Sequence, residues 1–221
     1  DLRYLVKQYE KDLNLKTENP IRIIAKIERS DAVKNIEEIL GVVDGIMVAR
    51  GDLGIETPAK DVPLVQKKLI DTALEYARPV IVATQMLDSM QNNPRPTRAE
   101  VSDVANAVID HTDAVMLSNE TATGNYPVET VQTMSDIISG AEKSVYDDLL
   151  VHEPKKKTSR VDEVISQMSR SLAEKIGAKV ILAASLSGET ARLISRYRPE
   201  LPIVVATGRD RVKHQLNLSW G

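Results

Sequence analysis

The sequence predicts an α/β fold in which parallel strands alternate with helices. Four apolar runs have the length and the Ile, Val and Ala content of buried strands, and they cover 21–27, 44–49, 79–84 and 113–117. A stretch with the apolar spacing of a helix follows each run. Repeated strand–helix units of this kind are typical of a parallel sheet with helices on its faces.

Polar residues stand at the end of each of these strands. They are Lys26 and Glu28, then Arg50 to Asp52, then Thr84 and Gln85, and finally Ser118 to Glu120. The carboxyl ends of parallel strands lie at one edge of the sheet, and barrel enzymes hold their catalytic residues there. Lys26 and Glu28 alternate onto one face, where the residues alone leave two interpretations open: an ion pair at the strand end, or a shared ligand or reaction.

Capping residues predict where the helices begin and end. We expect helices over 31–40, 61–77, 97–109 and 127–145. Ser30 is the expected N-cap of the first of these, and Gly41 is expected to end it. Thr97 with Glu100 three residues later forms a capping-box pattern, and Pro127 suits a first helical turn.

The composition changes near residue 150. Residues 151–158 are polar, basic and contain a proline, which predicts a surface linker. Beyond it we expect helices over 161–176 and 190–197 and from 210, with strands over 179–184 and 202–207. The predicted parts are a first domain over 1–150, the linker over 151–158, and an open α/β domain over 159–221 that is cut short.

Composition also narrows the class of partner. The 221 residues carry a formal net charge of −3 without a basic stripe, so nucleic acid is not an expected partner. No apolar run approaches the length that spans a bilayer, so a membrane is not expected either. The chain has no cysteine, which excludes disulfides and thiol chemistry and agrees with a reducing cytoplasm.

Six motifs, taken in order along the chain, closely resemble those of the pyruvate kinase family. They are Lys26–Glu28, Met47–Gly54, Ala83–Met86, Pro94–Glu100, Ser102–Ala107 and Met116–Ser118. The resemblance implies the second half of a TIM (β/α)8 barrel, beginning with a helix over 2–13, and then the start of a C-terminal α/β domain. It also implies that the chain is incomplete, with the first barrel strands and a nucleotide lid upstream, and that it is inactive alone.

The resemblance further implies an activity, which is Mg²⁺-dependent phosphoryl transfer from phosphoenolpyruvate to ADP. The products are pyruvate and ATP, and the reaction is the final step of glycolysis in the cytoplasm. The implied ions are Mg²⁺, with Mn²⁺ as its substitute, and K⁺, whose site would lie outside this chain. The full-length protein would be a homotetramer.

Two alternatives stay open. One is another phosphoenolpyruvate or pyruvate barrel enzyme, a lyase or mutase, which also places acidic metal ligands at strand ends. The Pro94–Glu100 motif and the second domain argue against it. The other is a non-catalytic fragment that only binds partners.

The resemblance assigns roles to the strand-end residues. Glu28 and Asp52 correspond to the carboxylates that hold Mg²⁺, an ion that takes oxygen ligands and keeps several waters. Lys26 corresponds to the lysine that stabilises the enolate oxygen as the phosphoryl group leaves. Gly51 and Asp52 are expected to present backbone N–H groups to the substrate carboxylate. Thr84 is expected to contact that carboxylate and to join the proton path through a water.

Four neighbouring residues are expected to support this group. Arg50 either contacts the substrate or pairs with a nearby carboxylate and holds the strand end. Gln85 is expected to brace its loop. Ser118 and Glu120 are expected to form a polar layer beneath the proton donor.

Two residues depart from the family's usual pattern. Asn119 stands where glycine is usual, and asparagine tolerates a left-handed backbone. His111 replaces a small residue on the loop before the fourth strand, where we expect it to be exposed. None of the histidines has a partner at catalytic spacing.

The loop between the first strand and the next helix of the second domain could present N–H groups and hydroxyls to a phosphate. It resembles the family's loop for a phosphorylated effector, with Ser185, Ser187, Gly188 and Thr190 as the contacts. Glu189 places a negative charge there, which favours a weak or sugar-monophosphate site over a tight bisphosphate site. The alternative is no effector and an ordinary helix cap made by Ser187.

Overall fold

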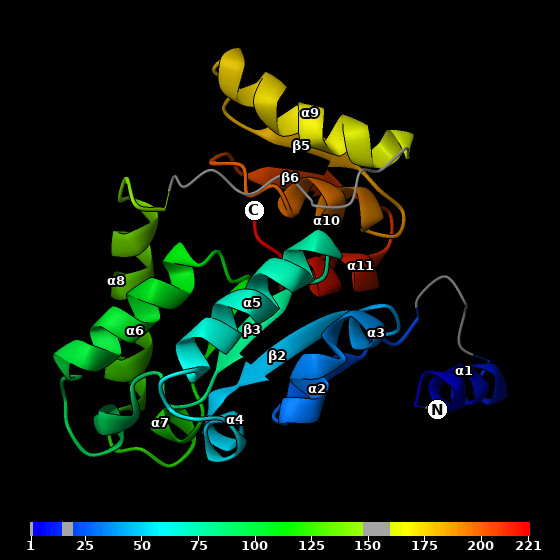
Figure 1. Ribbon diagram of the computed structural model, residues 1–221. Coiled ribbons are helices and arrows are strands. Elements are labelled where there is room, and N and C mark those ends of the chain that lie inside the picture. The colour runs from blue at the N-terminus through cyan, green and yellow to red at the C-terminus, as the bar shows by residue number, and fades with distance from the viewer. Residues whose placement is uncertain (1, 15–19, 148–159) are drawn as a thin grey trace.

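The computed structural model describes residues 2–14, 20–147 and 160–221 (Figure 1). Its first part is built on a parallel sheet whose strands lie side by side in chain order: β1 (Ile24–Ile27), β2 (Gly45–Ala49), β3 (Val80–Ala83) and β4 (Ala114–Met116). The strand ends are level, because Ala49 lies opposite Ala83 and Ala83 opposite Met116. The residues that follow the strands therefore meet at one edge of the sheet, as the sequence predicts.

Helices precede, connect and follow the strands of this first sheet. They are α1 (Leu2–Asp12), α2 (Ser30–Lys34), α3 (Ile36–Leu40), α4 (Arg50–Glu56), α5 (Val62–Glu75), the 3-10 turn η1 (Asp88–Gln91), α6 (Arg98–Ile109), α7 (Asn119–Ala122) and α8 (Pro127–Glu142). Helix α5 packs against both β2 and β3, and Figure 1 shows it lying across the sheet. The short helices α4 and α7 lie at the edge where the strands end (Figure 1).

The expected helix boundaries hold with one exception. The capping box is confirmed, since the Thr97 side chain accepts from the Glu100 N–H and the Glu100 side chain accepts from the Thr97 N–H. Pro127 begins α8 as predicted. The helix predicted over 31–40 is instead two helices separated at Asn35, and Ser30 lies inside the first rather than capping it. Asn35 has φ −103° and ψ 23°, which is not helical, and its side chain donates to the Asp31 carbonyl.

The buried core of the first part consists of aliphatic residues and methionines. All four residues of β3 are buried, and so are four of the five in β2, which is typical of a parallel sheet covered on both faces. Leu69, Ile70 and Ala73 of α5 pack into the same cluster as Ile46 and Val82.

A smaller parallel sheet forms the second part. Its strands are β5 (Ile181–Ala184) and β6 (Ile203–Ala206), and its helices are α9 (Val161–Lys175), α10 (Glu189–Ser195) and α11 (Asp210–Leu216). One face of this sheet is buried and the other is open, since Ile181 and Ala183 are buried whereas Leu182 is 72% exposed. The predicted linker over 151–158 lies outside the described residues. The predicted domain limits at 150 and 159 stay predictions.

The two parts meet at a buried cluster around His111, and the prediction that this histidine is exposed is wrong. His111 is 9% exposed, and its ring meets the Trp220 ring edge-on with the centroids 6.0 Å apart. Arg198, which is 1% exposed, donates to the His111 carbonyl and pairs with Asp113 at 2.7 Å. Trp220 also donates its backbone N–H to Asp113 at 2.9 Å. Because Arg198 and Trp220 lie more than 80 residues downstream, the residues around His111 in the sequence do not indicate this burial.

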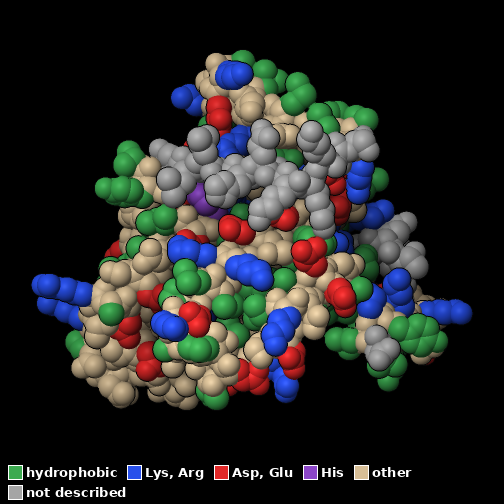
Figure 2. Space-filling view, in the orientation of Figure 1, with side chains coloured by type: hydrophobic (Ala, Val, Ile, Leu, Met, Phe, Trp, Pro, Cys, Tyr) green, Lys and Arg blue, Asp and Glu red, His purple; other side chains and the backbone are tan. Residues whose placement is uncertain are grey.

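Surface charge is mixed. On the face shown in Figure 2, basic and acidic side chains are interspersed and form no continuous basic area. Among the described residues, no helix is both long and apolar enough to span a membrane.

Candidate active site at the carboxyl edge of the first sheet

Lys26, Glu28 and Asp52 come together at the carboxyl edge of the sheet. Lys26 is the last residue but one of strand β1, and Glu28 directly follows the strand. Their side chains form an ion pair. The hydrogen bond and the negative charge of Glu28 raise the pKa of Lys26, as does the more distant charge of Asp52, whereas desolvation lowers it. The ammonium is therefore held in its charged form beside two carboxylates. The strand-end ion pair that the residues left open is present.

Glu28 and Asp52 fit the needs of a magnesium ion. Both are hard oxygen donors, the type that Mg²⁺ prefers. Glu28 Oε1 is buried and is the oxygen that pairs with the Lys26 ammonium. A carboxylate has about four lone-pair positions over its two oxygens, so Glu28 retains capacity for a metal ligand bond beside this ion pair. No cluster of three or more acidic or histidine ligands occurs in the described ranges. An ion held here would complete its coordination with water and substrate oxygens.

Thr84 follows strand β3 with an unusual backbone. Its φ is 70°, and that of the next residue, Gln85, is 55°. This left-handed region is uncommon for any residue except glycine and is an outlier for a β-branched one. The Thr84 hydroxyl donates to the Ala83 carbonyl at 2.6 Å and accepts the Gly51 N–H at 2.9 Å. A hydroxyl has one donor and two acceptor sites, so one acceptor position stays open.

The Gly51 N–H, which is expected to contact the substrate carboxylate, has a partner within the chain. It is bonded to the Thr84 hydroxyl. A Cβ at position 51 would come no closer than 3.7 Å to Thr84, so the glycine is not required by a steric clash at that point. Asp52, the next residue, is exposed in the first turn of α4.

Arg50 crosses the strand ends with its guanidinium buried. Its Nη1 pairs with Asp103 on α6 at 2.6 Å, and its Nη2 donates to the Thr84 carbonyl at 2.9 Å and contacts the Met86 sulfur. The arginine side chain is 10% exposed. Of the two roles left open for Arg50, the geometry favours pairing with a carboxylate. The sequence did not single out Asp103, because it lies 53 residues along the chain on a helix of another strand–helix unit.

The same fold and motifs occur in known proteins. Residues 6–131 match the family model described as "Pyruvate kinase, barrel domain", and residues 163–221 match "Pyruvate kinase, alpha/beta domain". The chain belongs to the pyruvate kinase family. Its four parallel strands and their helices are half of a TIM barrel, followed by part of the family's C-terminal α/β domain.

Individual members of the pyruvate kinase family agree with this assignment. A pyruvate kinase of Bacillus licheniformis is 53% identical over 202 residues, which are 91% of this chain and 34% of that protein. One from Clostridium acetobutylicum is 48% identical over 91% of this chain and 43% of its own length. The crystal structure of a pyruvate kinase from Cryptosporidium parvum superimposes with a TM-score of 0.91 at 40% identity and covers 99% of this chain and 46% of that chain. The chain thus spans between a third and a half of the relatives named here.

Behind the strand ends of this pyruvate kinase half-barrel, Glu120 joins two of the loops. It is 1% exposed, and it accepts the Ser118 N–H at 2.7 Å and the Leu87 N–H at 3.3 Å. Asn119 begins α7 and is not among the residues with positive φ, so its tolerance of a left-handed backbone is not used. The Gln85 side chain is exposed rather than packed into its loop.

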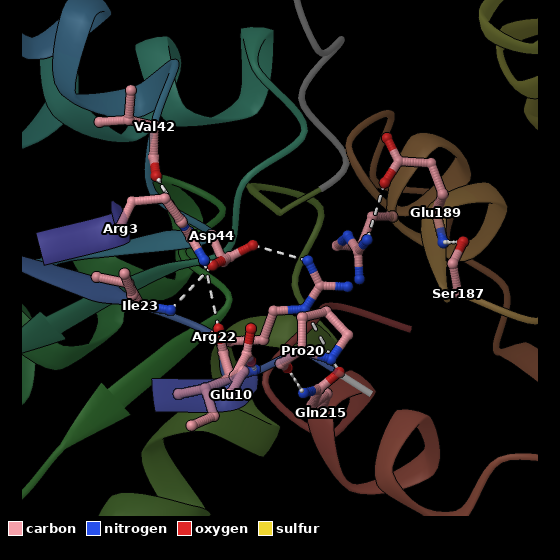
Figure 3. Close-up of polar contacts among 12 residues, drawn as sticks. Arg3, Glu10, Pro20, Arg22, Ile23, Val42, Asp44, Ser187, Glu189 and Gln215 are labelled. Atoms are coloured by element: carbon pink, nitrogen blue, oxygen red, sulfur yellow. Dashed lines mark hydrogen bonds and ion pairs between the residues drawn. The ribbon is translucent and has the colours of Figure 1, made fainter. Parts of the chain in front are cut away.

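The predicted effector loop has the geometry of a helix cap. Gly188 has φ 78° and stands at the N-cap of α10. The Ser185 hydroxyl accepts the Gly188 N–H at 3.0 Å, and the Ser187 hydroxyl accepts the Glu189 N–H at 3.3 Å. Glu189 pairs with Arg192 at 2.8 Å, and Figure 3 shows Ser187 and Glu189 in this arrangement. The N-cap is therefore Gly188 and not Ser187, the residue that the sequence offered as the cap, and the Ser187 hydroxyl instead bonds to the first turn from the position before it. The effector contacts stay a prediction.

Proposed function

We propose that this chain supplies the metal-binding and proton-transfer edge of a pyruvate kinase, which transfers a phosphoryl group from phosphoenolpyruvate to ADP and releases pyruvate and ATP. The single observation that carries the proposal is the grouping of Lys26, Glu28 and Asp52 at one sheet edge in a chain of this family. Phosphoryl transfer depends mainly on positioning and charge neutralisation, and these three charged side chains supply both.

The carboxylates of Glu28 and Asp52 are the proposed magnesium ligands. When bound, the ion would neutralise charge on the phosphoryl and enolate oxygens, and Mn²⁺ could take its place. Glu28 would have to share its charge between the ion and Lys26, since the ion pair is already formed. K⁺ is a proposed second ion on the ground of family membership, and none of the proposed site residues is assigned to it.

Lys26 is proposed to stabilise the enolate. Its raised pKa keeps the ammonium charged across the neutral range, so no proton has to be gained before it can act. A fixed positive charge beside the developing enolate oxygen stabilises the transition state more than the bound substrate.

Thr84 is proposed to take part in the proton path by accepting a hydrogen bond from a water. Its O–H points to the Ala83 carbonyl, and its free lone pair can accept a hydrogen bond from a water. That water would deliver the proton to the enolate carbon, because a threonine hydroxyl is too weak an acid to do so directly. Contact of Gly51, Asp52 and Arg50 with the substrate carboxylate is the weaker part of this proposal, since the Gly51 N–H and the Arg50 guanidinium already have partners.

The remaining functional assignments follow from family membership. We propose a homotetramer in the cytoplasm for the full-length protein, with domains over 1–150 and 159–221. We propose that Ser185, Ser187, Gly188 and Thr190 form a weak site for a sugar monophosphate. Glu189 keeps such a site weak, although its pairing with Arg192 offsets part of its charge.

Substitution of Lys26 tests the proposed function. In a full-length pyruvate kinase that contains this chain, Lys26→Met is expected to lower turnover by about 10²–10³-fold while the KM for phosphoenolpyruvate changes little. Lys60→Met is the matched control, because Lys60 is exposed on the loop before α5. Pyruvate formation would be followed at saturating ADP and Mg²⁺. Turnover of the Lys26 variant near that of the control would contradict the proposed role.

A further inference from the structure

Two successive residues at the start of α4 donate hydrogen bonds to Thr84, one to its backbone carbonyl and one to its side-chain hydroxyl. The Arg50 guanidinium donates to the Thr84 carbonyl at 2.9 Å, and the Gly51 N–H donates to the Thr84 hydroxyl at 2.9 Å. The Thr84 hydroxyl is further tied to the Ala83 carbonyl at 2.6 Å. The carbonyl and the hydroxyl of Thr84 are therefore both held by hydrogen bonds.

Thr84 needs this restraint because of its backbone. A left-handed conformation costs on the order of 1–3 kcal/mol for a residue other than glycine, and here two such residues follow each other. Conformations of this kind persist only where the surroundings impose them. Without a donor to its carbonyl, Thr84 would be free to return to an extended backbone, which would turn its hydroxyl away from Gly51.

Two further side chains hold the guanidinium of Arg50 in place. Its Nη1 lies 2.6 Å from Asp103 and 3.4 Å from the Gln66 side chain, and its side chain is 10% exposed. Asp103 thus fixes the guanidinium from α6, and Gln66 does so from α5. An arginine placed in this way has a planar fork that one lysine ammonium cannot reproduce.

We propose that Arg50 is a positioning residue for the proton-transfer step: it acts through Thr84, and Asp103 holds it in place. The inference rests on the proposed function, because it supposes that Thr84 lies on the proton path. It differs from substrate binding by Arg50, which would require the guanidinium to leave Asp103 and the Thr84 carbonyl.

The proposal predicts a particular pattern of kinetics. In a full-length pyruvate kinase that contains this chain, Arg50→Lys is expected to lower kcat by about 10²-fold, the cost of a misplacement near 1 Å, with the KM for phosphoenolpyruvate nearly unchanged. The exchange of pyruvate methyl protons with deuterium from water should fall by a similar factor. Asp103→Asn should lower both rates in the same direction by a smaller factor.

A double-mutant cycle separates positioning from general structural support. Because Arg50 acts through Thr84, the Arg50→Lys/Thr84→Ala double variant should be no slower than Thr84→Ala alone. Arg160→Lys and Asp162→Asn are the matched controls, since these residues form an exposed arginine–aspartate pair at the start of α9. Additive losses in the cycle, or a raised KM with unchanged kcat in Arg50→Lys, would overturn the proposal.

A structural measurement keeps the test independent of activity. In a crystal structure of the Arg50→Lys variant, the φ of Thr84 should return to a negative value and its hydroxyl should leave the Gly51 N–H. An unchanged left-handed Thr84 would overturn the proposal even if activity fell. If the parent protein made no pyruvate, the proposed function would fail, and the crystal structure would still decide the role of Arg50.

Discussion

Replacing His111 is expected to remove a pH dependence of stability. Burial, which is the largest cause, and the charges of Arg198 and Arg170 together lower the pKa of this imidazole from 6.5 to about 4, against the opposing charge of Asp110. Asp147 also faces the ring, with its Oδ1 3.8 Å from Nδ1. Both ring nitrogens are buried, and none of the described residues makes a hydrogen bond to either.

The sign and size of the effect follow from these two pKa values. In the unfolded chain the imidazole titrates near 6.5, so between 6.5 and about 4 the unfolded state binds a proton that the folded state does not. Stability should therefore fall as the pH falls through this window and be fully present above it. The whole gap corresponds to about 3 kcal/mol as an upper value. Carboxylates with lowered pKa, such as Asp44, lose their stabilising effect only at lower pH.

The assay is urea unfolding of the purified protein from about pH 7 to about pH 4, compared with His111→Asn. Asparagine is chosen because position 111 has φ 63°, which asparagine tolerates. His214→Asn is the control, since His214 is exposed on α11. The His111 variant should lose most of the slope, and the control should keep it. An equal slope in the parent and in His111→Asn would refute the argument.

Two further predictions concern carboxylates of the site. Glu28→Gln or Asp52→Asn should raise the Mg²⁺ concentration at half-maximal activity of the full-length enzyme, because each removes one of two proposed ligands. Glu38→Gln is the control, since Glu38 is exposed, and it should leave this concentration unchanged. An unchanged midpoint in both site variants would place the ion elsewhere. Glu120→Gln should destabilise the fold by about 1–3 kcal/mol in urea unfolding. The buried carboxylate accepts hydrogen bonds from two backbone N–H groups, and in the variant the amide NH₂ would face one of these donors. Unaltered stability would show that the amide rotates away from the donor without cost.

Much of the fold could be predicted from the sequence because its information is local. All six strands that the apolar runs predict are present, each shorter by one to three residues. The polar strand ends of the first sheet also meet at one edge, as the parallel arrangement requires. Hydrophobic periodicity and capping residues involve only a few neighbouring positions, so they can be recognised in the sequence without knowledge of tertiary contacts.

The errors arise where distant residues decide the outcome. His111 lies between Asp110 and Thr112, a polar setting that predicts exposure, but Trp220 and Arg198 bury it. The sequence leaves two roles open for Arg50, contact with the substrate or pairing with a carboxylate, because its partner Asp103 is apparent only in the three-dimensional structure. The left-handed backbone of Thr84 has no local sequence mark, since threonine disfavours it.

The protein uses the same restraint at two places where a non-glycine residue has a positive φ. At the active-site edge, Arg50 donates to the carbonyl of Thr84, which has φ 70°, and pairs with Asp103. At the domain contact, Arg198 donates to the carbonyl of His111, which has φ 63°, and pairs with Asp113. In each case a buried guanidinium has enough donors to serve a strained carbonyl and an aspartate together, which a lysine cannot do with the same planar geometry.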